Sequence, residues 1–149
     1  MTIGKADEAL AKAFRATTYR VMLGEARFDV RIGCRHSDLD GALAENGAKR
    51  WAIVTAWNPG SVVRPAEENA NALIRLEARA KDLGLVLYPA SNHADADQAA
   101  WPVEHGLFLC DATREVASAL ASEFGQLACV VGERNEVAEL LWTADQRLG

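Results

Sequence analysis

The chain has 149 residues, of which half are hydrophobic and a quarter are charged, and its net charge at pH 7 is −5. These values are typical of one globular domain. The acidic balance argues against a general binder of nucleic acid or anionic membranes, because such binding needs a concentrated basic face. No apolar run approaches the roughly 20 residues that a membrane helix needs, and the first eight residues lack the apolar core of a signal peptide. We therefore expect a single cytoplasmic domain over residues 1–149, with neither nucleic acid nor membrane among its partners.

Three cysteines, Cys34, Cys110 and Cys129, are scattered along the chain. Their number is odd and no CxxC pair is present, so they form neither a disulfide framework nor a metal knuckle. Cys110 and Cys129 lie in apolar runs that resemble strands. We expect both to be buried, reduced thiols.

The first third of the chain predicts a helix followed by a β-hairpin. Apolar side chains at helical spacing make residues 1–16 an N-terminal helical segment, with the helix itself at residues 5–16. Residues 17–23 are rich in β-branched and aromatic side chains. In residues 27–32 apolar and charged side chains alternate, which is typical of a half-buried strand.

The middle of the chain predicts two helices that alternate with two strands. A helix at residues 36–46 has Ser37 as its expected N-cap, and a second helix at residues 65–83 has Pro65 as its first residue. The strand at residues 51–57 is apolar throughout, which favours burial on both faces. A shorter strand is expected at residues 85–88.

A long loop is predicted at residues 89–103, because this stretch lacks regular periodicity. The remaining predicted elements are a strand, a helix capped by Thr113, and the two strands of a second hairpin, at residues 106–110, 113–124, 127–131 and 137–142. Three strand–helix–strand units between two hairpins predict an α/β domain, with α+β as the alternative class. We expect a mixed sheet of six or seven strands with a hairpin at each end and helices packed against it. Right-handed crossovers would place the helices together on one face.

The junction at residues 55–61 is the first candidate site. An apolar strand ends there in Asn58-Pro-Gly-Ser61, and ligands of open α/β sheets bind outside the carboxyl ends of parallel strands. The following helix N-terminus would favour an anion, with help from Arg64. The alternative is a structural turn in which Asn58 and Ser61 bond the local backbone.

Asn69 falls on or beside the apolar stripe of the helix at residues 65–83, and a buried amide without partners costs about 1–3 kcal/mol. The predicted stripe consists of Ala66, Ala70, Leu73, Leu76, Ala80 and Leu83. One interpretation is that Asn69 pins the preceding turn. The other is that Asn58 and Asn69 both line a small polar pocket, and the two are compatible.

Three further features allow a structural or a functional role. Trp101 either anchors the long loop or covers the end of the sheet, where Glu104 would face the same mouth as Asn58. Gln126 follows a helix end and can bond its exposed carbonyl groups. His93 with Asp95 and Asp97 lacks a second nearby histidine, so we expect no metal site. Nucleotide-binding and hydrolase motifs are missing from the sequence, and we expect no cofactor.

Several short motifs occur together in a fixed order: Thr17-Thr-Tyr19, Thr55-Ala-Trp-Asn-Pro59 with Ser61, Glu68-Asn69, Trp101-Pro-x-Glu104 and Phe124-Gly-Gln126. Together they resemble domain-of-unknown-function family 3293, a set of small bacterial proteins, over roughly residues 14–142. The alanine-rich stretch at residues 89–100 departs from the more polar, Gly-containing family pattern, which puts a metal role for His93 further in doubt. The resemblance implies no activity. It does emphasise the polar residues of these motifs, and this favours a shared pocket.

The leading hypothesis is a domain that binds a small polar or anionic molecule at the junction of residues 55–61. The candidate ligand-binding residues are Thr55, Asn58, Ser61, Glu68, Asn69, Trp101, Glu104 and Gln126. One alternative is an interaction module or homodimer that pairs through the edge strand at residues 137–142, with Trp142 exposed. The other is a hydrolase or transferase with Glu68 or Glu104 as general base, which needs a carboxylate with a raised pKa in a cleft.

Overall fold

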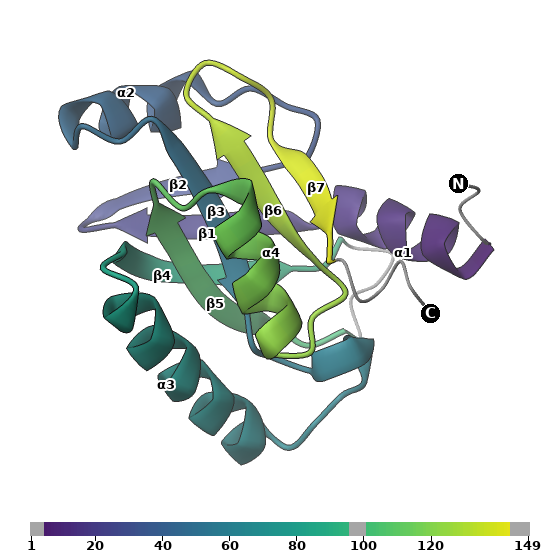
Figure 1. The fold of residues 1–149 in the computed structure, drawn as a ribbon. Helices are drawn as coiled ribbons and strands as arrows, with labels where there is room; N and C mark the ends of the chain where they lie inside the picture. Colours follow the sequence, from purple (N-terminus) through teal and green to yellow (C-terminus); the bar gives the residue numbers. More distant parts are fainter. Residues whose placement is uncertain (1–4, 96–100, 144–149) are drawn as a thin grey trace.

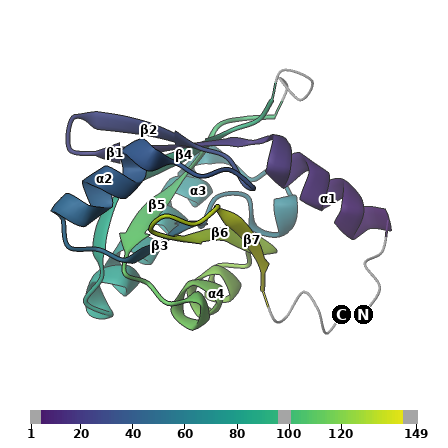
Figure 2. The same ribbon diagram turned by 90° about the horizontal axis from the view of Figure 1, so that it is seen from above.

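A curled sheet of seven strands forms the centre of the protein, in a computed structural model that describes residues 5–95 and 101–143 (Figures 1 and 2). The strands are β1 Thr18–Leu23, β2 Ala26–Val30, β3 Arg50–Thr55, β4 Val86–His93, β5 Glu104–Cys110, β6 Ala128–Glu133 and β7 Glu139–Trp142. The helices are α1 Lys5–Ala16, α2 Ser37–Glu45, α3 Ala66–Asp82 and α4 Arg114–Glu123, with a 3-10 turn, η1, at Pro59–Ser61. The predicted α/β class, the seven strands and both hairpins are confirmed.

The strand order is β2-β1-β4-β5-β3-β6-β7, and all six neighbouring pairs are antiparallel. The expectation of parallel neighbours in a mixed sheet was therefore wrong. Strands β3 and β4 do run parallel, but β5 lies between them, and β3 likewise separates β5 from β6. The units β3–α3–β4 and β5–α4–β6 are thus interleaved, as in a ferredoxin-like β-α-β-β-α-β arrangement.

The two edges of the sheet curl toward each other. A parallel bridge joins Ile32, just after β2, to Ala138, just before β7. The Gly33 N–H donates to the Ala138 carbonyl at 2.8 Å, and the Ala138 N–H donates to the Cys34 carbonyl at 3.0 Å. This contact gives the sheet an inner, concave face.

Helices cover both faces of the sheet, so the prediction of one shared face holds only for α3 and α4. These two helices pack on the outer face with apolar residues that include Val54, Leu76, Leu107 and Leu120. Helix α2 packs on the inner face, where Leu39 and Leu43 join a core that includes Trp51, Phe108 and Val130. Helix α2 joins β2 to β3, which also run parallel, but this connection crosses the sheet in the opposite direction to the one from β3 to β4 (Figure 2). A right-handed crossover in that direction places α2 on the other face.

Several predicted element boundaries needed correction. Pro65 is the N-cap of α3 and not its first residue. Ser37 is the first residue of α2 and not its N-cap, which is His36, and no side chain forms a capping hydrogen bond there. Thr113 does cap α4 as predicted, accepting from the Val116 N–H at 3.2 Å. Strand β4 continues through His93, into the segment predicted as a loop. Pro89 is tolerated there because β4 pairs with β1 only from Ala90 onward.

The buried stripe of α3 is rotated from the predicted one. Its buried residues are Asn69, Ala72, Leu76 and Ala80, whereas Ala66, Ala70 and Leu83 are exposed. The prediction placed Asn69 at the border of an alanine-rich face. The structure places it in the stripe, because its amide has partners to bond in the turn before the helix.

One end of the sheet gathers segments from most of the chain. Because neighbouring strands are antiparallel, the carboxyl ends of β3, β4 and β7 lie beside the amino ends of β1, β5 and β6. Helix α1 and η1 flank the same end (Figure 1). We call this end the mouth, and it is marked by Thr18, Thr55, His93, Glu104 and Ala128.

The three thiols are free, with Cys110 and Cys129 buried and Cys34 exposed, which confirms the predicted burial. Within the described ranges, no helix has the length and apolar character needed to cross a membrane.

Candidate functional site at the mouth of the sheet

A cavity of ≈ 340 Å³ lies between α1 and the mouth, and a narrow extension of ≈ 30 Å³ leads toward the inner core. The two cavities share Phe14, Tyr19, Ser61, Asn92 and Glu104, so we treat them as one mouth pocket. The outer part is also lined by Leu10, Ala13, Thr17, Ala94 and Trp101. The inner part is also lined by Ile53, Thr55, Asn58, Gln126, Leu127, Ala128, Cys129, Val130 and Leu140.

Three polar side chains form a row across the floor of this pocket. Tyr19 on β1 pairs with Asn92 on β4, and Asn92 pairs with Glu104 on β5. Residues directly opposite one another in antiparallel strands point to the same face. Further inside, the same face carries apolar core side chains, namely Val21, Ala90 and Phe108. The inner face therefore changes from apolar to polar at the mouth.

Glu104 is held by two neutral donors. Its Oε2 accepts from Nδ2 of Asn58 at 2.9 Å and from Nε1 of Trp101 at 3.2 Å. Burial raises the pKa of the Glu104 carboxyl, and the hydrogen bonds from Asn58 and Trp101 partly oppose that rise. Among the described residues, none forms a salt bridge with this carboxylate, and none donates a hydrogen bond to Oε1.

The Asn92 side chain carries a buried acceptor that has no partner among the described residues. Its Oδ1 is inaccessible to solvent and receives no hydrogen bond from any described residue. Buried polar atoms are nearly always bonded, so such an atom requires an explanation. Asn92 lines both parts of the mouth pocket beside Glu104, but its Oδ1 is turned away from the accessible space, whereas Oε1 of Glu104 is not buried in this way and remains open among the described residues.

Helix α1 forms the apolar wall of the pocket through Leu10, Ala13 and Phe14. The Tyr19 hydroxyl donates to the Phe14 carbonyl at 3.1 Å and fastens the end of the helix to the sheet. Burial raises the pKa of this hydroxyl. The Phe14 ring also meets Trp142 edge-on, with ring centroids 6.0 Å apart. Trp142 is therefore half-buried, and the homodimer hypothesis loses its exposed aromatic.

Asn58 and Asn69 brace the turn after β3. Oδ1 of Asn69 accepts from the Asn58 N–H at 2.9 Å, and Nδ2 of Asn69 donates to Oδ1 of Asn58 at 2.8 Å. The same Asn58 oxygen accepts from the Arg64 N–H at 2.9 Å. Both asparagines are 2% exposed. The interpretation in which Asn69 pins the turn describes these contacts, and Asn58 in turn orients the carboxylate of Glu104.

Two further predicted residues also bond backbone groups. Thr55 Oγ1 donates to the His105 carbonyl at 2.6 Å and accepts from the Trp57 N–H at 2.9 Å. Gln126 Nε2 donates to the carbonyls of Trp57 at 3.1 Å and Phe124 at 3.4 Å, so it does bond a helix-end carbonyl. Ser61 lines both parts of the pocket, and its hydroxyl forms no hydrogen bond within the described ranges.

Glu68 is a predicted site residue that lies outside the pocket, because it is exposed on the first turn of α3 and lines neither part of the pocket.

Sequence reasoning missed Tyr19 and Asn92 as site residues. The motif Thr17-Thr-Tyr19 was a signal for the first. Asn92 was not predicted as a site residue because it was assigned to the loop at residues 89–103 and not to β4. Asp97, one of the weighed metal ligands, lies outside the described residues, and the described part holds no group of three metal-ligating side chains.

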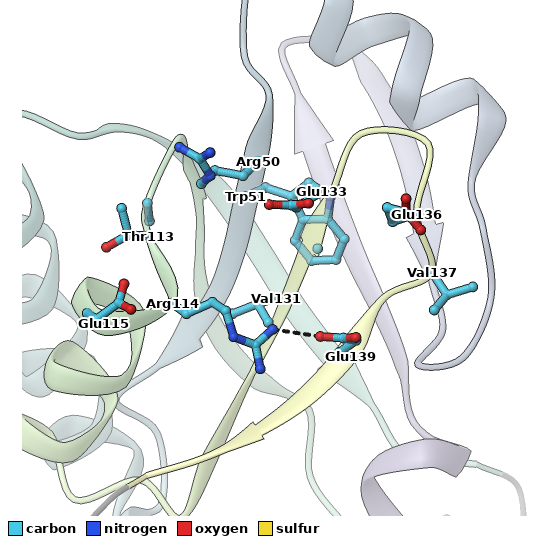
Figure 3. Close-up of a pocket in the computed structure, with 12 residues that line it drawn as sticks. Arg50, Trp51, Thr113, Arg114, Glu115, Val131, Glu133, Glu136, Val137 and Glu139 are labelled. Atoms are coloured by element: carbon cyan, nitrogen blue, oxygen red, sulfur yellow. Dashed lines mark hydrogen bonds and ion pairs between the residues drawn. The ribbon is translucent and has the colours of Figure 1, made fainter.

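A second concavity of ≈ 550 Å³ lies at the opposite end of β3, β5 and β6. Figure 3 shows Arg114 reaching from the start of α4 to Glu139 on β7, an ion pair of 2.6 Å with both partners more than half exposed. Arg50, Glu115, Glu133 and Glu136 also line it. This groove mixes exposed charges of both signs and contains none of the predicted site residues. The mouth pocket is therefore the better candidate.

Comparisons with known proteins identify a family but no characterised relative. A family model described as a protein of unknown function (DUF3293) matches residues 54–129. The matched segment contains every predicted site residue and Asn92, but not α1 or Tyr19. The searches of curated proteins and of solved structures gave no match.

Proposed function

We propose, from the premise that this chain belongs to the DUF3293 family, that it is a cytoplasmic protein whose mouth pocket binds a small organic molecule. The ligand would place a polar group against Glu104 and Ser61 and an apolar part along α1. Ligand pockets commonly combine apolar walls with a few convergent polar groups. The free thiols are compatible with a reducing compartment.

The observation that carries this proposal is the partly buried carboxylate of Glu104, whose Oε1 accepts no hydrogen bond within the described ranges. A carboxylate oxygen held partly away from water without a donor costs about 1–3 kcal/mol, and a ligand donor would remove that cost. Of the polar or anionic ligands expected from the sequence, the pocket favours a polar one. Its described lining residues include no Lys, Arg or His to hold an anion.

A fragment screen followed by amide chemical shifts in NMR would test the proposal. We expect hits to perturb the amides of Tyr19, Asn92 and Glu104. Ala13→Trp should fill the outer cavity and abolish these shifts. Lys12→Trp, on the exposed side of the same helix, introduces the same side chain and should leave binding intact.

Asn58→Ala is a poor test of binding, because Asn58 braces the turn. The proposal would fail if no fragment perturbed the mouth amides in the screen. It would also fail if the Ala13→Trp variant bound the fragment hits as tightly as the parent protein does.

A hydrolase or transferase is the second candidate, with Glu104 as general base. The favouring observation is a largely buried carboxylate with a raised pKa in a pocket that also contains the Ser61 hydroxyl. Glu68 has no comparable setting. Turnover of any fragment hit that persists in Glu104→Gln would contradict this candidate without affecting the binding proposal.

A further inference from the structure

We infer that the polar group of the ligand is a protonated primary amine, bound at Oε1 of Glu104. This inference rests on the proposed function and specifies the class of ligand. It follows from the charge of the pocket, from the number of open acceptors and from the shape of the remaining space.

The described residues give the pocket a negative charge, and none of them compensates it. Glu104 is the carboxylate among the lining residues, and its two protein donors, Asn58 and Trp101, are both neutral. Buried charges in proteins are normally paired. A cationic head would supply the missing partner, whereas a carboxylate or phosphate head would be repelled.

The open hydrogen-bonding groups require several donors at one point. Oε1 of Glu104 accepts no hydrogen bond within the described ranges, and the Ser61 hydroxyl of the η1 turn lines the same pocket. A primary ammonium carries three N–H donors and can serve both groups. A hydroxyl brings one donor, and a quaternary ammonium brings none.

The rest of the pocket suits an apolar substituent. Leu10, Ala13 and Phe14 of α1 line the ≈ 340 Å³ outer part with hydrocarbon. The ligand class is therefore a primary amine that carries an aromatic or branched aliphatic group.

Three matched probes test the head group: 2-phenylethylamine, 2-phenylethanol and 3-phenylpropanoate, titrated into the full chain with amide shifts as readout. We expect the amine to bind more tightly than either analogue. Glu104→Gln should weaken the amine about 10- to 100-fold, as expected for loss of a charged hydrogen bond, and should leave the alcohol nearly unchanged. Glu68→Gln removes an exposed carboxylate outside the pocket and is the matched control.

Ser61→Ala provides a second variant, and should weaken the amine about three- to tenfold through loss of a neutral acceptor. Equal or tighter binding of the alcohol or the carboxylate to the parent would overturn the amine assignment and leave the proposed function standing. Unchanged amine affinity in folded Glu104→Gln would do the same. If neither these probes nor any screened fragment perturbs the mouth amides, both proposals fail together.

Discussion

The side-chain amides of Asn58 and Asn69 are bonded to each other, and Asn69 also accepts the backbone N–H of Asn58. This reciprocal pair joins the turn after β3 to the first turns of α3. It occupies the polar atoms that would otherwise be open to a ligand. Through Nδ2 of Asn58, it also holds the carboxylate that faces the mouth pocket.

Asn69→Ala should lower the free energy of unfolding by about 1–3 kcal/mol, because the buried Asn58 N–H loses its acceptor. Urea denaturation would measure the change. Asn71→Ala, at an exposed position of the same helix, is the control and should change stability by less than about 0.5 kcal/mol. Equal effects of the two substitutions would show that the brace has no energetic role.

The raised pKa of Glu104 predicts a pH-dependent cost of burial. Above the ordinary pKa of 4.5, the folded state binds more protons at this site than the unfolded state, so this group's contribution to stability falls as pH rises. Glu104→Gln removes that dependence. The stability of the variant relative to the parent should therefore increase from pH 3.5 upward and level off once Glu104 is ionised in the folded state.

Urea midpoints of both proteins between pH 3.5 and pH 7 would measure this difference, since the other carboxyl groups cancel. A difference that is constant with pH, or that declines, would contradict the raised pKa.

Alanine substitutions at two glycines should change the stability of the protein in opposite directions. A Cβ on Gly132 would lie 2.5 Å from Cε2 of Trp51, a 3% exposed ring stacked on Phe108. Gly132→Ala should destabilise the protein by about 1–3 kcal/mol through overpacking. Gly41 lies inside α2, where an added methyl group would meet no packing neighbour within 4 Å, so Gly41→Ala should stabilise by about 0.5–1 kcal/mol. Thermal unfolding of both variants measures the contrast, and shifts of the same sign would refute it.

The three thiols should differ in reactivity. Burial, with a smaller effect of the Asp111 charge, raises the pKa of Cys110 to about 11, and burial raises that of Cys129 to about 12 despite Arg114. At pH 8 Ellman's reagent should modify exposed Cys34 quickly and the other two only when the protein unfolds. Cys34→Ser should abolish the fast phase. A fast phase that survives in this variant would mean that a buried thiol is accessible.

Local patterns were sufficient to predict most of the elements. The helix at Lys5–Ala16, the cap of α4 by Thr113 and the two hairpins were all predicted from spacing and from residues with strong conformational preferences. The inward position of Asn69 also followed from its spacing, and the family motifs selected most of the residues now found near the mouth. Helical period, capping and turn chemistry depend on neighbours within a few positions, so a single sequence contains them.

The pairing of distant strands was decided only by the tertiary structure. The Asn58–Glu104 hydrogen bond joins residues 46 apart, and the Tyr19–Asn92–Glu104 row exists because β4 and β5 insert between β1 and β3. Nothing near Asn92 in the sequence indicates that its amide oxygen is buried without a donor. The sequence by itself thus determined the elements and the polar turn. Which polar atoms remained open for a ligand depended on strand order and register, because these set which side chains bond one another first.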